Sequence, residues 1–372
     1  MTHLIDLGAT PCDCANYGIE TLHKAIAEGP DESALWRAHD NPFIRALVDH
    51  SSDTGFSMID QARQALFGAL GLGAPHALLR KSDPVDIESL RARLAKPLAA
   101  YTPDDWLALV DLIWATRIPP AAASVAADDL AVKATLAGHL QAISDGRLSL
   151  GSAAALIALM DRVTPTIGAL GIPFSARERE AAAFARARIG LNLTGVTDAG
   201  RARVARSILT HVQEHGLAAP RKLEQTLLDD FGAMNRDWRR IAVTEAGETA
   251  NVTYAASHPD GSRFKRVEAY EGACPFCRKL DGMVFTWSAA PRPNSDGWSH
   301  IWPGKTNVGR AASARKQTPE GLVERTESEL WWPAAGVQHP NCRGRWVSLP
   351  DQTPPPGVDP AFHAWLLKEL ET

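Results

Sequence analysis

The chain has 372 residues, of which 45% are hydrophobic and 22% are charged. This composition is ordinary for a soluble globular protein, and the length is sufficient for two or three domains. A net charge of −4 argues against a chain that coats nucleic acid along its whole length. The longest apolar run, residues 148–160, is too short to span a bilayer and is expected to form a buried helix. No basic region followed by an apolar stretch opens the sequence, so we expect neither secretion nor a membrane partner.

Up to residue 257 the sequence has the periodicity of helices, with apolar residues spaced three and four apart. Thr102, followed by Pro103 and two acidic residues, predicts the start of a helix with Thr102 as its cap. Thr197 and Asp198 predict that another helix begins there and ends at Gly216. The other expected helices cover residues 57–70, 87–95, 104–116, 130–144, 176–191 and 237–254.

Beyond residue 257 the pattern changes to short strand-like pieces, residues 264–270 and 283–287, separated by stretches rich in Gly, Pro and Asn. Residues 288–310 are expected to be loop, and so are residues 311–328 apart from one helical turn. Five prolines in residues 349–360 predict an extended linker, and residues 361–370 predict a short amphipathic helix. The fold class expected is therefore mainly α, with a small, loop-rich α+β module at the C-terminal side.

Four residues in that module have the spacing of metal ligands. Cys274 and Cys277 are separated by two residues, and so are His339 and Cys342. Two side chains from one tight turn can reach a single ion, and two such turns supply the three thiolates and one imidazole that suit tetrahedral zinc. Because no ligand position remains for water, we predict one structural zinc per chain, which cross-links two segments of a loop-rich domain.

Two other readings of these cysteines are less favoured. A disulfide is not expected, because no signal peptide is seen and the chain has only five cysteines. Zinc deaminases also use a Cys-x-x-Cys pair, but they need an upstream His-x-Glu. The nearest candidate here is His258-Pro259-Asp260, which lacks the glutamate.

Charge and tryptophan are concentrated in residues 236–346. This segment holds 16 Lys and Arg against 12 Asp and Glu, a balance of +4, and seven of the eleven tryptophans. A mildly basic, Trp-rich module could contact nucleic acid or a protein partner. We favour the alternative that the tryptophans form a small core around the metal. The seven are Trp238, Trp287, Trp298, Trp302, Trp331, Trp332 and Trp346.

Three weaker motifs suggest other functions. His211 and His215 match the His-x-x-Glu-His pattern of inverted zinc peptidases, but the helix ends directly after them and no third ligand stands out. The segment Gly304-Lys305-Thr306 resembles the end of a phosphate-binding loop, yet the required earlier glycine is Ser299. Cys12 and Cys14 form a pair without a nearby third ligand, and a second metal contact there is the minor reading.

Several short motifs, in a fixed order, resemble the Mu-like phage minor head protein family, also called the phage head morphogenesis family. The resemblance covers roughly residues 179–349. Two positions depart from the family pattern: Val243 replaces an arginine, and Gly344 replaces the second cysteine of Cys-Arg-Cys, which leaves the four-ligand set intact. The motifs are Ile241-Ala242-Val243-Thr244-Glu245, Ala250-Asn251, Cys274-Pro275-x-Cys277, Leu280-Asp281-Gly282-x-Val284-Phe285 and His339-Pro340-Asn341-Cys342-Arg343.

The resemblance implies an assembly protein without enzyme activity. Such proteins are minor components of the phage or prophage head, which associate with the portal protein and with other head or scaffold proteins during procapsid assembly. The expected location is the virion, inside the head or at the portal vertex, after assembly in the host cytoplasm. The local positive charge leaves room for weak DNA contact.

We therefore predict a structural head morphogenesis protein with four regions. These are a helical N-terminal region over 1–170, the helical part of the head morphogenesis domain over 171–257, a zinc-stapled α+β module over 258–348, and a linker with a short helix over 349–372. The alternatives are a metal-dependent hydrolase, either a peptidase or a nuclease-like toxin, and a zinc-containing nucleic-acid-binding module.

Overall fold

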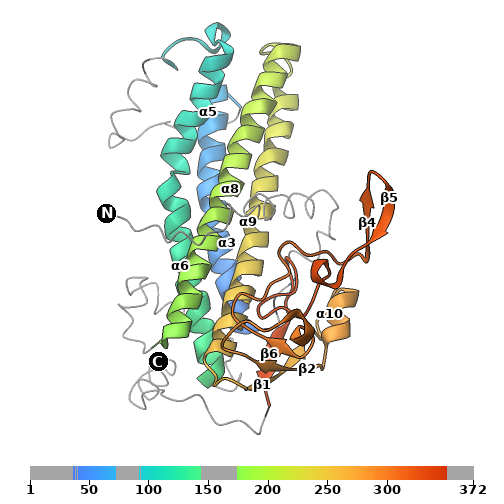
Figure 1. Cartoon of the computed structure of the whole chain (residues 1–372). Coiled ribbons are helices and arrows are strands. Elements are labelled where there is room, and N and C mark those ends of the chain that lie inside the picture. Colours follow the sequence, from blue (N-terminus) through green and yellow to red (C-terminus); the bar gives the residue numbers. More distant parts are fainter. Residues whose placement is uncertain are drawn as a thin grey trace, which may run out of the picture. The chain divides into compact units, whose positions relative to one another are not determined.

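The computed structural model describes residues 41–72, 94–143 and 174–349, together with residues 37, 39 and 92. Helices dominate these residues, and the short strands lie after residue 262, so the expected class, mainly α with a small α+β module, is confirmed (Figure 1). Among the helices in these ranges, none is both long and apolar enough to cross a membrane. The principal helices are α3 (Pro42–Leu70), α5 (Pro103–Arg117), α6 (Pro120–Ile143), α8 (Ala176–His215), α9 (Pro220–Ala256) and α10 (Pro275–Leu280).

Some sequence predictions concern residues outside the described ranges. They are the buried helix over 148–160, most of the helix over 87–95, the proline-rich stretch from 350 onward, the C-terminal helix over 361–370, and the Cys12–Cys14 pair.

The chain forms two compact units, and their boundaries fall inside helices α3, α6, α8 and α9. The first unit contains the candidate metal ligands. It comprises Met1–Arg45, Val132–Ala185 and Val243–Thr372, and the second unit comprises Ala46–Ala131 and Arg186–Ala242.

The start of α5 lies in the second unit and has the cap expected from the sequence. Thr102 donates from its backbone N–H and from its hydroxyl to one carboxylate oxygen of Asp105, each at 2.7 Å. Pro103 takes the first helical position, where its missing N–H costs nothing. The residues at the helix start were therefore sufficient to predict the cap and the first turn.

Helix α8 contradicts the prediction of a new helix at Thr197. It runs without interruption from Ala176 to His215 (Figure 1). The hydroxyl of Thr197 donates to the carbonyl of Thr194 at 2.9 Å, which satisfies the side chain inside the helix instead of at a cap. The helix ends where expected, because Gly216 has a φ of 60°, a conformation suited to glycine at a helix C-terminus.

Trp238 anchors the second unit and does not belong to the C-terminal module with the other six tryptophans. Its side chain is fully buried, and the indole N–H donates to the carbonyl of Ser51 at 3.0 Å. The neighbouring Arg239 reaches Asp49 at 3.2 Å. These contacts join α9 to α3 within the second unit.

The first unit contains a four-stranded sheet in the order β3-β2-β1-β6. Strand β1 pairs antiparallel with β2 and with β6, whereas β3 pairs parallel with β2. Its core combines strand residues with the end of α9, including Phe264, Phe285, Trp346 and Tyr254. The small sheet therefore has no core of its own. The strands are β1 (Arg263–Val267), β2 (Val284–Trp287), β3 (His300–Ile301) and β6 (Arg345–Ser348).

The prediction that residues 311–328 lack strands is wrong. Strands β4 (Arg315–Thr318) and β5 (Gly321–Glu324) form an antiparallel hairpin, drawn apart from the larger sheet in Figure 1. Their residues are mostly exposed, so no apolar alternation marks them in the sequence. Backbone pairing defines this element, with an ion pair between Arg315 and Glu324 at 3.9 Å across its two strands.

Candidate metal centre

The first pair of candidate ligands lies at the start of α10. Cys274 caps this helix, and its sulfur accepts a hydrogen bond from the backbone N–H of Cys277 at 3.4 Å. Pro275 occupies the first turn, where it needs no hydrogen-bond partner. One helical turn therefore aims both sulfurs in the same direction, as the two-residue spacing predicted.

The second pair lies on a tight turn. The backbone N–H of Cys342 donates to the carbonyl of His339 at 3.1 Å, and Asn341 has a φ of 63°, which asparagine tolerates better than most residues. The Nδ1 atom of His339 lies 2.8 Å from the carbonyl oxygen of Pro340. Because a carbonyl can only accept, Nδ1 carries a proton and Nε2 is the atom that faces the sulfurs.

The structure brings all four predicted residues together. His339 Nε2 lies 3.3 Å from the sulfur of Cys274 and 3.2 Å from that of Cys277, and the sulfurs of Cys277 and Cys342 are 3.8 Å apart. In a tetrahedral site with metal–sulfur bonds of ~2.3 Å, two sulfurs are about 3.8 Å apart. Cys277 and Cys342 are fully buried, whereas Cys274 and His339 are half-buried.

Glu268 is a fifth donor that the sequence analysis missed. Both of its carboxylate oxygens lie 3.7 Å from the sulfur of Cys342. The donors therefore form two overlapping groups that share Cys277, namely Cys274–Cys277–His339 and Glu268–Cys277–Cys342, and within each group all ligand atoms lie within 4.8 Å of one another. These five residues form a cluster that could bind a metal ion.

The sequence does hold a signal for Glu268. In β1 the inward positions are Phe264 and Arg266, and Arg263 and Lys265 are exposed. A strand that turns an arginine toward its core needs a buried acid nearby. Glu268 follows two residues later and lies 2.7 Å from the guanidinium of Arg266.

The electrostatics of the cluster favour thiolates at Cys274 and Cys342, whereas hydrogen bonds to these two sulfurs, together with burial, raise the pKa of Cys277. A hydrogen bond from Cys277 lowers the pKa of Cys274 to about 4 despite burial, and the interaction with His339 adds to this effect. Burial opposes ionisation of Cys342, but the hydrogen bond from Cys277 and the charge of Arg266 hold its pKa well below the usual value. Burial also lowers the pKa of His339, but Cys274 and Cys342 raise it to about 9. Thiolate is the form of cysteine that binds metals.

The ligand turn is fastened to one face of α9. Thr244, Glu248 and Asn251 follow one another at spacings of four and three, so their side chains share that face. Each accepts from or donates to the backbone of the segment that carries His339 and Cys342. The bonds are Asn341 N–H to Thr244 Oγ1 at 3.0 Å, Val337 N–H to Glu248 Oε2 at 2.6 Å, and Asn251 Nδ2 to the carbonyl of Gly344 at 2.9 Å.

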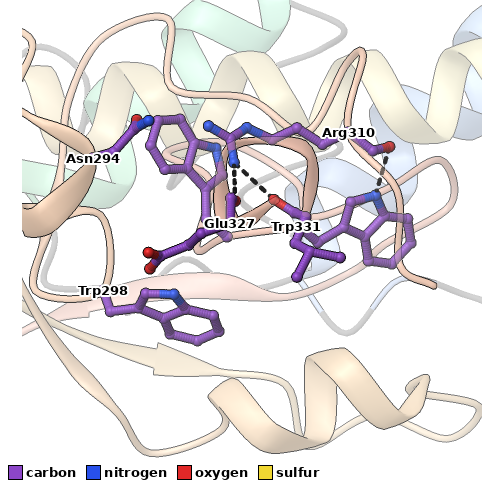
Figure 2. A pocket seen from close by; sticks show the side chains of 7 residues that line it. Asn294, Trp298, Arg310, Glu327 and Trp331 are labelled. Carbon is purple, nitrogen blue, oxygen red and sulfur yellow. Dashed lines mark hydrogen bonds between the residues drawn. The ribbon is translucent and has the colours of Figure 1, made fainter. Parts of the chain in front are cut away.

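An aromatic pocket of about 80 Å³ lies near the cluster, lined by Trp298, Trp331, Trp332, Arg310 and others (Figure 2). Trp331 stacks on the ring of His339 with 11° between the planes. The guanidinium of Arg310 lies 3.5 Å from the ring centre of Trp332 and donates to the carbonyl of Leu330 at 2.7 Å. Trp331 therefore packs against one candidate ligand, and Trp332 lies against the cations of Arg310 and Lys305 of the same chain.

The two peptidase-like histidines make polar contacts near the C-terminal end of α8. His211 Nε2 lies 2.9 Å from the carbonyl of Ala218, and His215 Nε2 lies 2.9 Å from Lys222 Nζ. Both contacts stabilise the end of α8. In the ranges that the structure describes, neither histidine belongs to a group of three metal-binding side chains.

Lys305, from the phosphate-loop-like motif, is buried and donates to two backbone carbonyls. They are those of Gly297 at 2.5 Å and His300 at 2.7 Å. Its ammonium also lies 4.7 Å from the ring centre of Trp332. With both carbonyls and an aromatic face as neighbours, this lysine is engaged within its own module.

No family model, curated protein or solved structure matches this chain. The function must therefore be inferred from the cluster and from the residues that surround it.

Proposed function

We propose that Cys274, Cys277, His339 and Cys342 hold one structural zinc ion. Three sulfurs and one imidazole are the donors that zinc prefers in closed sites, and the spacing of the two buried sulfurs, 3.8 Å, fits such a site. An ion there would link α10 to the turn over 339–342. Because the small sheet shares its core with α9, this link would stabilise the first unit as a whole.

We further propose that the chain is a minor head morphogenesis protein of a phage or prophage, and that it joins the procapsid through contacts with the portal protein. One observation carries this proposal: the residues of the separate motifs that resemble the phage head family are partners of one another. Thr244 holds Asn341, and Asn251 holds Gly344 beside Cys342. A set of motifs that jointly builds one fold is what a shared structural module would require.

The loop motif around Asp281 and Gly282 belongs to the same arrangement. Asp281 Oδ1 accepts from the backbone N–H of Glu268 at 2.8 Å, and Gly282 donates to the carbonyl of Arg266 at 2.9 Å. Gly282 has a φ of 78°, which disfavours any residue with a side chain. The motif therefore supports β1 and the donor Glu268, and it suggests a structural role for these residues instead of a catalytic one.

Zinc content is the first test. Elemental analysis of purified protein should find about one zinc per chain, and Cys277→Ser should abolish it and loosen the first unit, while Cys12→Ser, which leaves all four ligands unchanged, should not. A folded wild-type protein without zinc would contradict the proposed site.

The assembly role needs a separate experiment. We expect the protein to co-purify with the portal protein from nuclease-treated lysate at moderate salt, and to be found in procapsids. Its net charge of −4 gives little gain from counterion release on a duplex. Association that vanished after nuclease treatment, with DNA binding retained, would favour a nucleic-acid-binding module instead.

A further inference from the structure

Arg266 is a fully buried arginine that reaches the candidate metal centre at the buried sulfur of Cys342. Its Nη2 donates to the sulfur of Cys342 at 3.5 Å, and its Nη1 donates to the carbonyl of Gly336 at 3.1 Å. The guanidinium carbon lies 4.7 Å from the ring centre of Trp346, the residue paired with Arg266 across β1 and β6. Backbone pairing and an aromatic face thus fix where this cation lies.

Glu268 binds the third nitrogen of the guanidinium, Nε. One carboxylate oxygen accepts from Arg266 Nε at 2.7 Å, and both side chains are fully buried. Room for this carboxylate exists because residue 344 is glycine: a Cβ at Gly344 would lie 2.2 Å from the carboxyl carbon of Glu268. The absence of a side chain at position 344 is therefore a condition for the Arg266–Glu268 pair.

Charge explains why a cation at this place matters. A divalent ion with three thiolates carries a net charge of −1, and a buried charge without a partner is costly. A hydrogen bond from an ionised donor to a ligand is stronger than one between neutral groups. Partners outside the ligand set commonly change metal affinity by about 10–100-fold.

We propose that Arg266 is an outer-sphere positioning residue of the metal centre. It donates to the sulfur of Cys342 and offsets part of the negative charge that the metal–thiolate group and Glu268 carry together, and Glu268, accommodated by Gly344, fixes the guanidinium in that place. This inference rests on the proposed metal site and adds to it the residues that retain the ion.

The test uses the full chain loaded with Zn²⁺ for release kinetics and with Co²⁺ for spectroscopy. Arg266→Met alone would leave Glu268 buried without its partner, so the main variant is Arg266→Met with Glu268→Gln. We expect zinc release to a chelator to become about 10-fold faster or more. We also expect the sulfur-to-cobalt charge-transfer band to move to longer wavelength. Without the hydrogen bond from Arg266, the sulfur of Cys342 holds its electrons less tightly, so the transition needs less energy.

Three further variants separate this role from a purely structural one. Glu268→Gln and Gly344→Ala keep Arg266 but loosen or displace its partner, and both should shift the same band by a smaller amount. Arg266→Lys retains the charge and should restore part of the slow release. Arg278→Met is the matched control, because that exposed arginine donates to the carbonyl of Ala273 at 2.7 Å and not to a sulfur.

The outcomes are decisive in each case. A folded double variant with wild-type release and an unchanged cobalt band would overturn the role of Arg266. If the double variant does not fold, unchanged bands in both Glu268→Gln and Gly344→Ala would overturn it equally. A wild-type protein that binds neither Zn²⁺ nor Co²⁺ would instead remove the metal site itself, and this inference with it.

Discussion

Gly336→Ala should release the ligand turn from α9, although residue 336 is not itself one of the candidate ligands. A Cβ at this glycine would lie 1.8 Å from Glu248 Oε2 and 2.1 Å from the carboxyl carbon, far inside van der Waals contact. The same oxygen accepts from the backbone N–H of Val337 at 2.6 Å. Because the carboxylate is the flexible end of its side chain, it must rotate away, and Val337 loses its acceptor.

The size of the effect follows from these contacts. Losing a hydrogen bond to a charged group costs about 1.5–3 kcal/mol, and replacing glycine by alanine returns about 0.4–1 kcal/mol through the unfolded chain. We therefore expect a local destabilisation of about 1.5 kcal/mol. Since every ~1.4 kcal/mol is a factor of ten, the amide of Val337 should exchange its hydrogen about 10-fold faster.

Hydrogen exchange of the metal-loaded protein, followed for the segment around Val337, measures this directly. Gly190→Ala is the matched control: it lies inside α8, and the nearest atom to its Cβ would be Ala127 Cβ at 3.8 Å. That change should stabilise the protein by about 0.5–1 kcal/mol. Unchanged exchange at Val337 in Gly336→Ala would refute the reasoning, because it would mean that the carboxylate of Glu248 does not hold the turn.

Three other predictions concern titration and the peptidase-like motif. Burial opposes ionisation of Glu178, but its 2.6 Å contact with His139 helps lower its pKa from 4.5 to about 2. The ionised carboxylate contributes up to about 3 kcal/mol to the free energy of unfolding; this contribution is present above pH 4.5 and lost as the pH falls toward 2. In urea titrations, the difference in the free energy of unfolding between the wild type and Glu178→Gln should therefore shrink over that range. Burial, with the charge of Arg310, lowers the pKa of Lys305 from 10.5 to about 7. Between pH 7 and 10.5 the unfolded chain therefore binds this proton more than the folded protein does, so the stability of the wild type should rise with pH over that range. Thermal melts of Lys305→Met should lack that rise. Replacing His211 and His215 by Ala should cost only a modest part of helix stability and leave phage yield in a complementation assay intact, whereas a block in head maturation by a folded double variant would favour the peptidase alternative.

Local chemistry in the sequence was sufficient wherever neighbouring residues determine the structure. Thr102, Pro103 and Asp105 specify a helix start among themselves, and Gly216 specifies an end. The Cys-x-x-Cys and His-x-x-Cys spacings likewise predict two turns that each present two donors. The meeting of those two turns was inferred from the chemistry of shared coordination, and the structure does bring the four side chains together.

Long-range packing decided what local patterns could not. Thr197 has the chemistry of a cap, but its hydroxyl is satisfied within α8, so the helix continues. Trp238 falls in the Trp-rich segment by sequence, yet its indole lies against α3 in the second unit. The β4–β5 hairpin carries no apolar alternation and is defined by backbone pairing.

The clearest case is Glu268. By sequence, the alternation in β1 places Arg266 on the same inward face as Phe264 and makes Glu268 its candidate partner, but nothing nearby in the chain shows that residue 344 leaves room for the carboxylate or that Cys342 lies beside it. Its position beside Cys342 depends on β1 and β6 pairing across about 80 residues of intervening chain, and on the Asp281 turn that holds its backbone. Spacing along the chain therefore determined which side chains could share an ion, and only the tertiary structure determined which buried charges lie beside it.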